Sequence, residues 1–305
     1  MGWQSKTEAG EVVLIDGGTG SELQRRGVPT SDATWGGTAL HTHPDVVRDV
    51  HRSFIEAGAE VIIANTFGTA RFQLEAAGRG DEFESLNRLA VELAREARDA
   101  SGNAVEIAGS MSNLPPNFDV ADYPDAHREL DDLRALAELL ADQEVDLIAL
   151  EMMQDTHHAP LAMEAALETG LPVWLGLSCR CSSEGDGLVS FDLVDIDFAD
   201  PLDALIEMGP SAVNLMHCEV ASVLPAIEMV RRRWSGPIGV YPEVGYFTYP
   251  NWHFDEDSTP ERYAAHAQRW VDAGALIVGG CCGTGPEHIA ALRGAGLGGW
   301  PWPAA

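Results

Sequence analysis

The stretch Leu276–Leu292 reads LIVGGCCGTGPEHIAAL, which is a short apolar run, a glycine-rich turn with two adjacent cysteines, and an amphipathic segment. Pro286 suits the first turn of a helix, where the backbone N–H that proline lacks has no helical partner to bind. A strand, a polar turn and a helix form the repeating unit of α/β proteins. The stretch therefore predicts one such unit, with Cys281 and Cys282 on the loop after the strand.

Units of the same kind recur along the chain. Short apolar runs rich in β-branched residues predict eight strands, at Val12–Ile15, Val61–Ala64, Val105–Ala108, Leu147–Leu150, Val173–Leu177, Ala212–Leu215, Ile238–Val240 and Leu276–Val278. Amphipathic segments predict helices at Asp45–Ala57, Glu82–Asp99, Asp125–Asp142, Ala159–Glu168, Pro201–Glu207, Ala221–Arg233, Pro260–Ala273 and Pro286–Leu292.

This recurrence indicates a fold of the α/β class. Apolar strands that alternate with helices form a parallel sheet with both faces buried. Eight units predict a (β/α)8 barrel of the TIM type, with the chemistry on the loops that follow the strands. A chain of 305 residues could hold two ordinary domains or one barrel, and we expect a single barrel domain over residues 1–305. The alternative is a doubly wound sheet, which would place the same loops along one edge.

Three predicted loops are long, namely Gly17–Thr42, Cys179–Ala199 and Tyr241–Thr259. Loops of this length in a compact domain are usually functional. Each of them follows a predicted strand, so all three would lie on the catalytic face of a barrel.

The composition is strongly acidic, with 48 Asp and Glu against 19 Lys and Arg and a formal net charge of −29. Such a surface repels nucleic acid and anionic membranes, so neither is expected as a partner. Adaptation to high salt, which screens self-repulsion, is the simplest explanation. The polar N-terminus, the lack of any run of ~18 apolar residues and the odd number of cysteines predict a cytoplasmic protein without a disulfide framework.

Three cysteines could meet at one end of a barrel. Cys218 follows the sixth predicted strand, and Cys281 and Cys282 follow the eighth. Thiolates favour zinc, and three protein ligands leave one coordination position open, as in catalytic zinc sites. The glycines around the pair permit the backbone geometry that both side chains need to converge. The sequence therefore predicts a Zn2+ site formed by Cys218, Cys281 and Cys282.

Other interpretations of these residues stay open. Cys218 alone fits a small buried apolar residue, and the adjacent pair could form a strained disulfide or be inert. His217 is either a group that supports a ligand or a competing ligand. Cys179 and Cys181 form a weak Cys-x-Cys signal, for which packing or exposure to solvent is the simpler explanation.

An open zinc site with three thiolates is negatively charged and therefore makes hydroxide poorly, which disfavours a zinc hydrolase. It is well suited to holding an incoming thiol as thiolate near neutral pH, where a free thiol with a pKa of ~8.5 is mostly protonated. Coordination of this kind activates a sulfur nucleophile. The natural reaction class is alkyl transfer to a thiol.

Several motifs occur together in this chain. They are GGCCGT with the upstream Cys218, DGGTGSEL at 16–23, Trp35-Gly36 with Ala39-Leu40, Pro44 through His51 followed by EAGAE at 56–60, NTF at 65–67, and Glu151 after the fourth strand. Together they resemble the zinc-dependent homocysteine S-methyltransferases, over roughly Val12 to Leu292. The resemblance implies a (β/α)8 barrel in which the three cysteines bind zinc and homocysteine supplies the fourth ligand.

The resemblance also implies how the rest of homocysteine binds. Asp16 and Glu151 would hold its ammonium group, and the glycine-rich turn at Gly17, Gly18 and Thr19 could offer backbone N–H groups to its carboxylate. The alternatives are ordinary loop or capping carboxylates and a tight glycine turn.

The chain departs from the family pattern at three places. The family usually has Asn where His217 precedes the sixth-strand cysteine, and often Thr or an aromatic residue where Met152 follows Glu151. After the seventh strand, Tyr-Pro-Asn-Ser-Gly is replaced by the sequence YPEVG at 241–245. These differences concern the methyl-donor pocket more than the zinc site.

The loop after the seventh strand carries the aromatic residues Tyr241, Tyr246, Phe247, Tyr249 and Trp252 around Glu243. Aromatic faces attract sulfonium and quaternary ammonium groups by ~0.5–2 kcal/mol each. Tyr241, Tyr246 and Trp252 are therefore candidates for the pocket of an onium donor such as S-methylmethionine or a betaine. Packing of these rings on the barrel rim is an equal alternative.

The sequence thus predicts a zinc-dependent S-methyltransferase that forms methionine from homocysteine. Its expected partners are small molecules. The sequence is also compatible with a homo-oligomer. One alternative is the homocysteine module of a multi-component methionine synthase, to which a partner protein supplies the methyl group. Another is a non-catalytic protein that binds zinc or homocysteine and regulates a partner.

Overall fold

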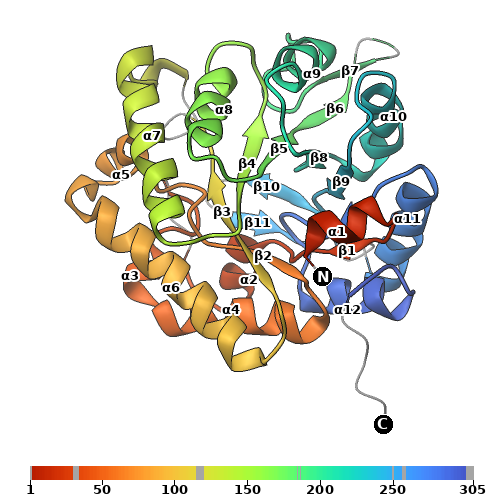
Figure 1. The fold of residues 1–305 in the computed structure, drawn as a ribbon, viewed down its shortest axis with the longest axis horizontal. Coiled ribbons are helices and arrows are strands. Elements are labelled where there is room, and N and C mark those ends of the chain that lie inside the picture. The colour runs from red at the N-terminus through yellow and green to blue at the C-terminus, as the bar shows by residue number, and fades with distance from the viewer. Residues whose placement is uncertain are drawn as a thin grey trace.

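The computed structural model describes residues 2–29, 34–114, 120–183, 185, 187–248, 251–255 and 259–299. Its centre is an eight-stranded sheet in the order β1-β12-β9-β8-β5-β4-β3-β2 (Figure 1). All neighbouring pairs in it are parallel. The strands are β1 Val13–Leu14, β2 Val61–Ile63, β3 Glu106–Met111, β4 Leu147–Met153, β5 Val173–Leu177, β8 Ala212–Met216, β9 Ile238–Tyr241 and β12 Ile277–Val278.

Contacts between the first and second strands close the sheet into a barrel. Ile15 forms a parallel bridge with Val61. The backbone N–H of Asp16 donates a hydrogen bond of 3.2 Å to the carbonyl of Val61. The predicted α/β fold with a TIM-type (β/α)8 barrel is confirmed, and the doubly wound alternative is wrong, because such a sheet stays open at its edges.

Helices surround the barrel (Figure 1), and all eight predicted ones are present. Their apolar faces pack on the outward-facing strand residues and form the larger core cluster. In α6, for example, Leu86, Ala90, Leu93 and Ala97 are buried, which is the spacing of one helix face. The helices are α4 Pro44–Ala57, α6 Phe83–Ser101, α7 Ala126–Asp142, α8 Ala159–Glu168, α9 Ala199–Ile206, α10 Val220–Arg231, α11 Pro260–Asp272 and α12 Pro286–Gly294.

Alternate strand residues fill the barrel interior. In β1, Val13 belongs to the inner cluster and Leu14 to the outer one. Helix α1 (Trp3–Glu8), which the sequence did not predict, adds Trp3 to the inner cluster. Its ring meets that of Trp174 edge to face, with 5.1 Å between the centroids. Trp174 lies near the start of β5, so this pair fills the barrel end opposite the carboxyl ends of the strands.

The long loops contain short elements that the sequence did not predict, because such elements leave a weak periodic signal. The first loop holds α2 (Thr19–Arg25) and α3 (Ala39–Thr42), and α5 (Arg71–Ala76) follows β2. The loop after β5 forms a hairpin of β6 and β7, and the loop after β9 forms one of β10 and β11. Their bounds are β6 Cys179–Cys181, β7 Leu188–Ser190, β10 Tyr246–Thr248 and β11 Asn251–His253.

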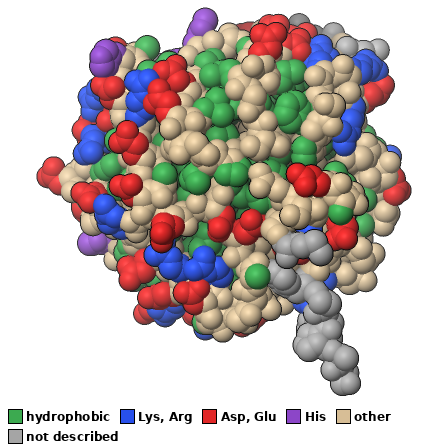
Figure 2. All heavy atoms as spheres, viewed as in Figure 1, with side chains coloured by type: hydrophobic (Ala, Val, Ile, Leu, Met, Phe, Trp, Pro, Cys, Tyr) green, Lys and Arg blue, Asp and Glu red, His purple; other side chains and the backbone are tan. Residues whose placement is uncertain are grey.

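The surface reflects the acidic composition. Figure 2 shows Asp and Glu side chains around much of the face that carries α1, with Lys and Arg side chains among them and hydrophobic side chains near its centre. Arg134, for example, contacts Glu164 and Glu168 at 2.7 Å each. Within the described ranges, none of the helices has the length and apolar character needed to cross a membrane.

Candidate active site

A cavity of about 790 Å³ lies at the carboxyl ends of the barrel strands. The residues around it come from the loops after most of the strands, as a TIM barrel requires. Of the residues predicted from the sequence, Asp16 and Cys218 are not part of the lining. The predicted residues that do line it are Gly17, Gly18, Thr19, Glu151, Tyr241, Tyr246, Trp252, Cys281 and Cys282.

The paired cysteines lie on a sharp turn after β12. The Cys281 N–H donates to the carbonyl of Pro242 at 3.0 Å, and the Cys282 carbonyl accepts from the N–H of Val244 at 2.8 Å. Gly283 has a φ of 84°, and a side chain there would place its Cβ 1.7 Å from the carbonyl oxygen of Val244. Only glycine therefore fits this turn, which is held against the loop after β9.

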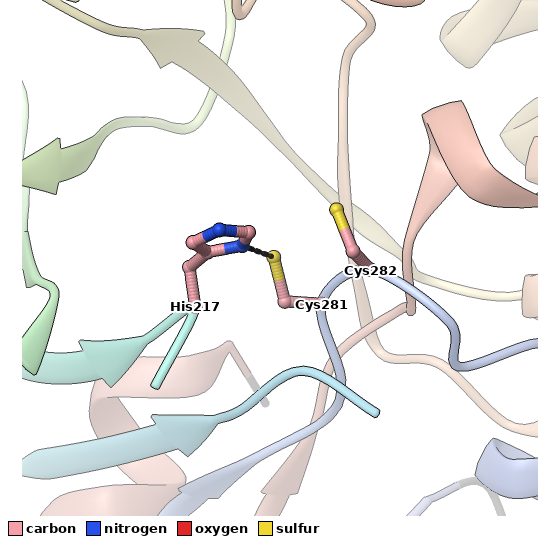
Figure 3. A group of neighbouring side chains, drawn as sticks. All are labelled: His217, Cys281 and Cys282. Atoms are coloured by element: carbon pink, nitrogen blue, oxygen red, sulfur yellow. Dashed lines mark hydrogen bonds between the residues drawn. The ribbon is translucent and has the colours of Figure 1, made fainter. Parts of the chain in front are cut away.

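His217 completes a cluster of metal-binding side chains with the two cysteines (Figure 3). Its Nδ1 lies 3.6 Å from the Cys281 sulfur, and one ligand atom from each of the three residues lies within 4.8 Å of the others. His217 follows β8 and has a φ of 46°, in the left-handed region. That backbone conformation directs the imidazole into the cavity, where all three residues are half-buried.

Glu243 and Phe191 hold the imidazole of His217 from other sides. A Glu243 carboxylate oxygen lies 3.2 Å from Nε2, as an ion pair that is out of line for a hydrogen bond. The Phe191 ring meets the imidazole edge to face at 4.8 Å. Burial alone would lower the pKa of His217, but Glu243 and the sulfur of Cys281 raise it to about 10. The neighbouring Cys282 and burial raise the pKa of the Cys281 thiol.

Cys218, predicted as the third zinc ligand, lies in the outer core. Its sulfur is 3.6 Å from that of Cys179, accepts the Cys179 N–H at 3.2 Å, and donates to the carbonyl of Met216 at 3.1 Å. The hydrogen bond to Cys218 and burial raise the pKa of Cys179. Among the described residues, the ligand cluster contains His217 and not Cys218. Sequence reasoning had left His217 open as a competing ligand.

Asp16 and Glu151 form a buried acidic pair beside this cluster. Asp16 accepts the N–H of Ile63 at 2.8 Å, and Glu151 accepts a hydrogen bond from the Ser110 hydroxyl. Burial raises the pKa of Asp16 despite the bond from Ile63, and the charge of Glu151 raises it further. Burial also raises the pKa of Glu151 to about 7, against the bond from Ser110. Two acids held in this way favour a bound cation between them.

The glycine-rich turn after β1 packs against the cysteine turn. Gly18 donates its N–H to the carbonyl of Thr284 at 3.1 Å. The Ser21 hydroxyl donates to the Gly18 carbonyl at 3.0 Å and accepts the N–H of Gly283 at 2.9 Å. The N–H of Gly18, which the sequence assigned to a substrate carboxylate, is therefore engaged within the protein.

The sequence profile of the homocysteine S-methyltransferase family matches residues 13–295. This span covers the whole barrel and the cysteine turn. The chain belongs to the homocysteine S-methyltransferase family. It is therefore a methyltransferase.

Named relatives agree with this assignment. Homocysteine S-methyltransferase of Escherichia coli (strain K12) is 30% identical over 93% of this chain and 94% of its own length. Selenocysteine methyltransferase of Astragalus bisulcatus is 30% identical over 92% of this chain and 91% of its own. The metallated and oxidised crystal structures of the Escherichia coli homocysteine methyltransferase MmuM superpose with TM-scores of 0.71 and 0.74 at 24% identity, and cover 93% of this chain and 96% and 95% of theirs. These two likenesses establish the common fold.

The three residues predicted for the methyl-donor pocket lie at different depths in the cavity of the methyltransferase. Tyr241 and Trp252 are buried, whereas Tyr246 is 61% exposed at the mouth of the cavity. Within the described part of the chain, the buried hydroxyl of Tyr241 has no hydrogen-bond partner. The same loop also carries Tyr249, which lies outside the described residues.

Other residues, which the sequence analysis did not assign to the site, also line the cavity of the methyltransferase. Trp35 from the first loop meets Phe247 edge to face at 5.4 Å. The guanidinium of Arg180 lies 3.9 Å from the centre of the Phe191 ring. Arg180 is the middle residue of the Cys-x-Cys motif. The motif therefore contributes this arginine to the cavity lining. Acidic residues also line the cavity, namely Asp155, Asp192, Glu219 and Glu243.

Proposed function

We propose that this methyltransferase transfers a methyl group from an onium donor to the sulfur of homocysteine and forms methionine with the help of zinc, in one barrel domain. The observation that carries the proposal is the position of Cys281 and Cys282 at a cavity that also exposes Glu151. A sulfur-rich cluster next to a buried acid pair suits a substrate with a thiol at one end and an ammonium group at the other.

The chemistry of the donor set fits zinc. Two cysteine sulfurs and an imidazole nitrogen are ligands that zinc prefers, and their atoms lie within 4.8 Å of one another. When bound, zinc would lower the pKa of the homocysteine thiol and hold its sulfur as a nucleophile. Cys281 and Cys282 are the two residues that the sequence and the geometry both favour as ligands.

The other side chains would position the acceptor. Asp16 and Glu151 would bind the ammonium group, since two buried carboxylates gain most from a cation placed between them. Glu151 lines the cavity, whereas Asp16 is not among the lining residues. Gly17 and Thr19 also line the cavity and could contact the substrate carboxylate through their backbone.

The donor would bind near the mouth of the cavity. Trp35, Tyr246 and Phe247 present aromatic faces there, which attract a sulfonium or quaternary ammonium group. The acidic lining adds to this attraction. The sulfur of homocysteine attacks the methyl carbon in line, a new S–CH3 bond forms, and the electrons of the broken bond leave with the donor, which becomes neutral at its onium atom.

A donor panel tests this proposal. Purified protein in the reducing conditions expected of a cytoplasmic enzyme would be incubated with homocysteine and either S-methylmethionine or a betaine, at low and high salt, and methionine measured by mass spectrometry. Turnover that a chelator abolishes and added zinc restores is the expected result. Binding of homocysteine without turnover of either donor would instead favour a regulatory protein or a module of a multi-component methionine synthase.

A second acceptor belongs in the same panel. The selenocysteine methyltransferase of Astragalus bisulcatus is as similar to this chain as the Escherichia coli homocysteine enzyme, at 30% identity each. Selenocysteine would present a selenol and an ammonium group to the same residues. A higher kcat/KM for selenocysteine than for homocysteine would identify it as the preferred acceptor.

A further inference from the structure

We infer that Arg180 binds a carboxylate of the methyl donor, and that the donor is therefore an onium compound that also carries a carboxylate. This inference rests on the proposed function and narrows its donor to one chemical class. S-methylmethionine and the betaines belong to this class. Simple sulfonium and quaternary ammonium ions without a carboxylate do not.

Arg180 is an unpaired cation in an acidic cavity. It lines the cavity from the middle of β6, and its Nε is buried without a hydrogen-bond partner. Among the described residues, its guanidinium forms no ion pair. Other arginines of the chain do form such pairs, since Arg26 contacts Glu22 at 2.8 Å and Arg134 contacts Glu168 at 2.7 Å. The guanidinium of Arg180 is therefore available to an anionic group of a ligand.

Three of the carboxylates that line the same cavity are held by other groups. Asp155 accepts backbone N–H groups of the turn before α8, two of them at 2.6 Å. Asp192 accepts a hydrogen bond from the side-chain amide of Gln154 at 2.8 Å. Glu243 faces the imidazole of His217 at 3.2 Å. These contacts explain why none of the three described acids pairs with the guanidinium on β6.

The ring of Phe191 holds the guanidinium of Arg180 in position. The guanidinium carbon lies 3.9 Å from the centre of the ring, which is a cation–π contact. A guanidinium packed on a ring keeps its N–H groups at the edge, where they can bind both oxygens of a carboxylate in one plane. Arg180 is thus oriented in advance for a carboxylate.

Phe191 also connects Arg180 to the sulfur cluster. The other neighbour of its ring is the imidazole of His217, at 4.8 Å between the ring centres. Nδ1 of His217 lies 3.6 Å from the sulfur of Cys281. The guanidinium, the two rings and the cysteine therefore form a continuous series of contacts. A donor whose carboxylate binds Arg180 would direct its onium end along this series, towards the acceptor sulfur.

Homocysteine is a less suitable partner for Arg180. Its carboxylate is attached to the same carbon atom as the ammonium group, which we assign to Asp16 and Glu151. The turn that contains Gly17 and Thr19 also lines the cavity and follows Asp16 directly, so it can serve this carboxylate. Arg180 belongs to a separate hairpin, formed by β6 and β7. That hairpin is left for the second substrate.

Matched donors with and without a carboxylate test the inference on the wild-type protein. Methionine formation from homocysteine would be measured with S-methylmethionine and with (3-aminopropyl)dimethylsulfonium, which lacks only the carboxylate. Betaine and tetramethylammonium form a second pair. We expect kcat/KM to be about 10–100-fold higher with the carboxylate, as the strength of charge-assisted hydrogen bonds predicts. Equal values within the pair that is used would overturn the inference and leave the proposed function standing. No turnover of any donor would overturn both.

Substitution of Arg180 gives an independent test, with folding checked by circular dichroism. Arg180→Met should lower kcat/KM for the carboxylate-bearing donor about 10–100-fold and leave the carboxylate-free analogue and the KM for homocysteine near the wild-type values. Arg180→Lys, which keeps the charge, should recover part of the loss. The matched control Arg71→Met removes an arginine packed on Phe83 at 4.4 Å outside the cavity and should change none of these values. Equal losses for both donors in folded Arg180→Met, or a rise confined to the KM for homocysteine, would refute the assignment.

Discussion

Gln24 binds the backbone of Trp252 with both ends of its side-chain amide. Its Nε2 donates to the Trp252 carbonyl and its Oε1 accepts the Trp252 N–H, each at 2.8 Å. Trp252 in turn donates its indole N–H to the carbonyl of Val244 at 3.1 Å, and Val244 donates to the carbonyl of Cys282. One glutamine on α2 thus fixes the β10–β11 hairpin above the cysteine turn.

This relationship predicts that Gln24→Ala weakens donor binding. Loss of two hydrogen bonds worth about 0.5–1.5 kcal/mol each would loosen the hairpin and raise the KM for the methyl donor about tenfold, with the KM for homocysteine changed less. Steady-state kinetics measure both values. Gln268→Ala, which removes an exposed contact to Asp272 on α11, is the matched control. An equal rise in both KM values would argue against a specific role in the donor site.

Glu151→Gln should raise the KM for homocysteine by about 10–100-fold, because a charge-assisted hydrogen bond to the ammonium group contributes about 1.5–3 kcal/mol. The donor KM and the zinc content should stay near the wild-type values. Glu138→Gln, at an exposed position of α7, controls for loss of one charge. Unchanged homocysteine binding in the Glu151 variant would remove this residue from the substrate site.

Because of the buried His51 on α4, we expect the folded protein to lose stability in acid. His51 is fully buried, both ring nitrogens have no hydrogen-bond partner within the described part of the chain, and burial lowers its pKa from 6.5 to about 4. Folding favours the neutral form of His51. Its contribution to the free energy of unfolding is therefore complete above pH 6.5 and is lost as the pH falls towards 4. At about 1.4 kcal/mol per pH unit, the loss between pH 6.5 and 5 is about 2 kcal/mol.

Urea unfolding at both pH values measures this effect. The variant His51→Leu should lose about 2 kcal/mol less than the wild type between pH 6.5 and 5. His127→Leu, at a side chain that is 85% exposed, should behave like the wild type. If the wild type and His51→Leu lost the same free energy of unfolding between pH 6.5 and 5, the prediction would be contradicted.

Trp3→Ala should destabilise the fold by about 3–5 kcal/mol, as removal of a large buried aromatic side chain does. Trp3 is 3% exposed and packs on Trp174. The variant Gln4→Ala changes the exposed neighbour on the same helix and should alter the free energy of unfolding by less than about 0.5 kcal/mol. A loss below 1 kcal/mol in the Trp3 variant would show that α1 contributes little to the barrel.

Added salt should raise the melting temperature. A net charge of −29 on 305 residues creates self-repulsion, which is screened over about 3 Å in 1 M salt. Melting curves in potassium chloride from 0.1 to 2 M would show the rise. A melting temperature that falls or stays constant over this range would contradict an adaptation of the chain to high salt.

The barrel could be predicted from the sequence because its strands are short runs of apolar residues between amphipathic helices. Val13 and Leu14, for instance, face opposite cores and must both be apolar. Helix α1 escaped prediction because Trp3 and Thr7 are the buried residues of a single short element. Its position depends on Trp174, which lies far away in the sequence.

The candidate site could be predicted less completely, for a specific physical reason. The sequence places His217 and Cys218 side by side, and either could reach the cavity. Regular strand alternation would turn the cysteine side chain into the cavity, whereas the φ of 46° at His217 turns the histidine side chain into it. That dihedral angle depends on contacts with Glu243 and Phe191, which come from two other loops and leave no local signal.

The two hairpins at the cavity mouth each pair within themselves and not with the barrel sheet. Phe191 follows one of them and Trp252 belongs to the other, and their rings lie 4.8 and 6.1 Å from that of His217. Such self-contained pieces can be exchanged as units while the barrel keeps its register. Grafting of hairpins that keep Phe191 and Trp252 against His217 is therefore a practical route to new donor preferences.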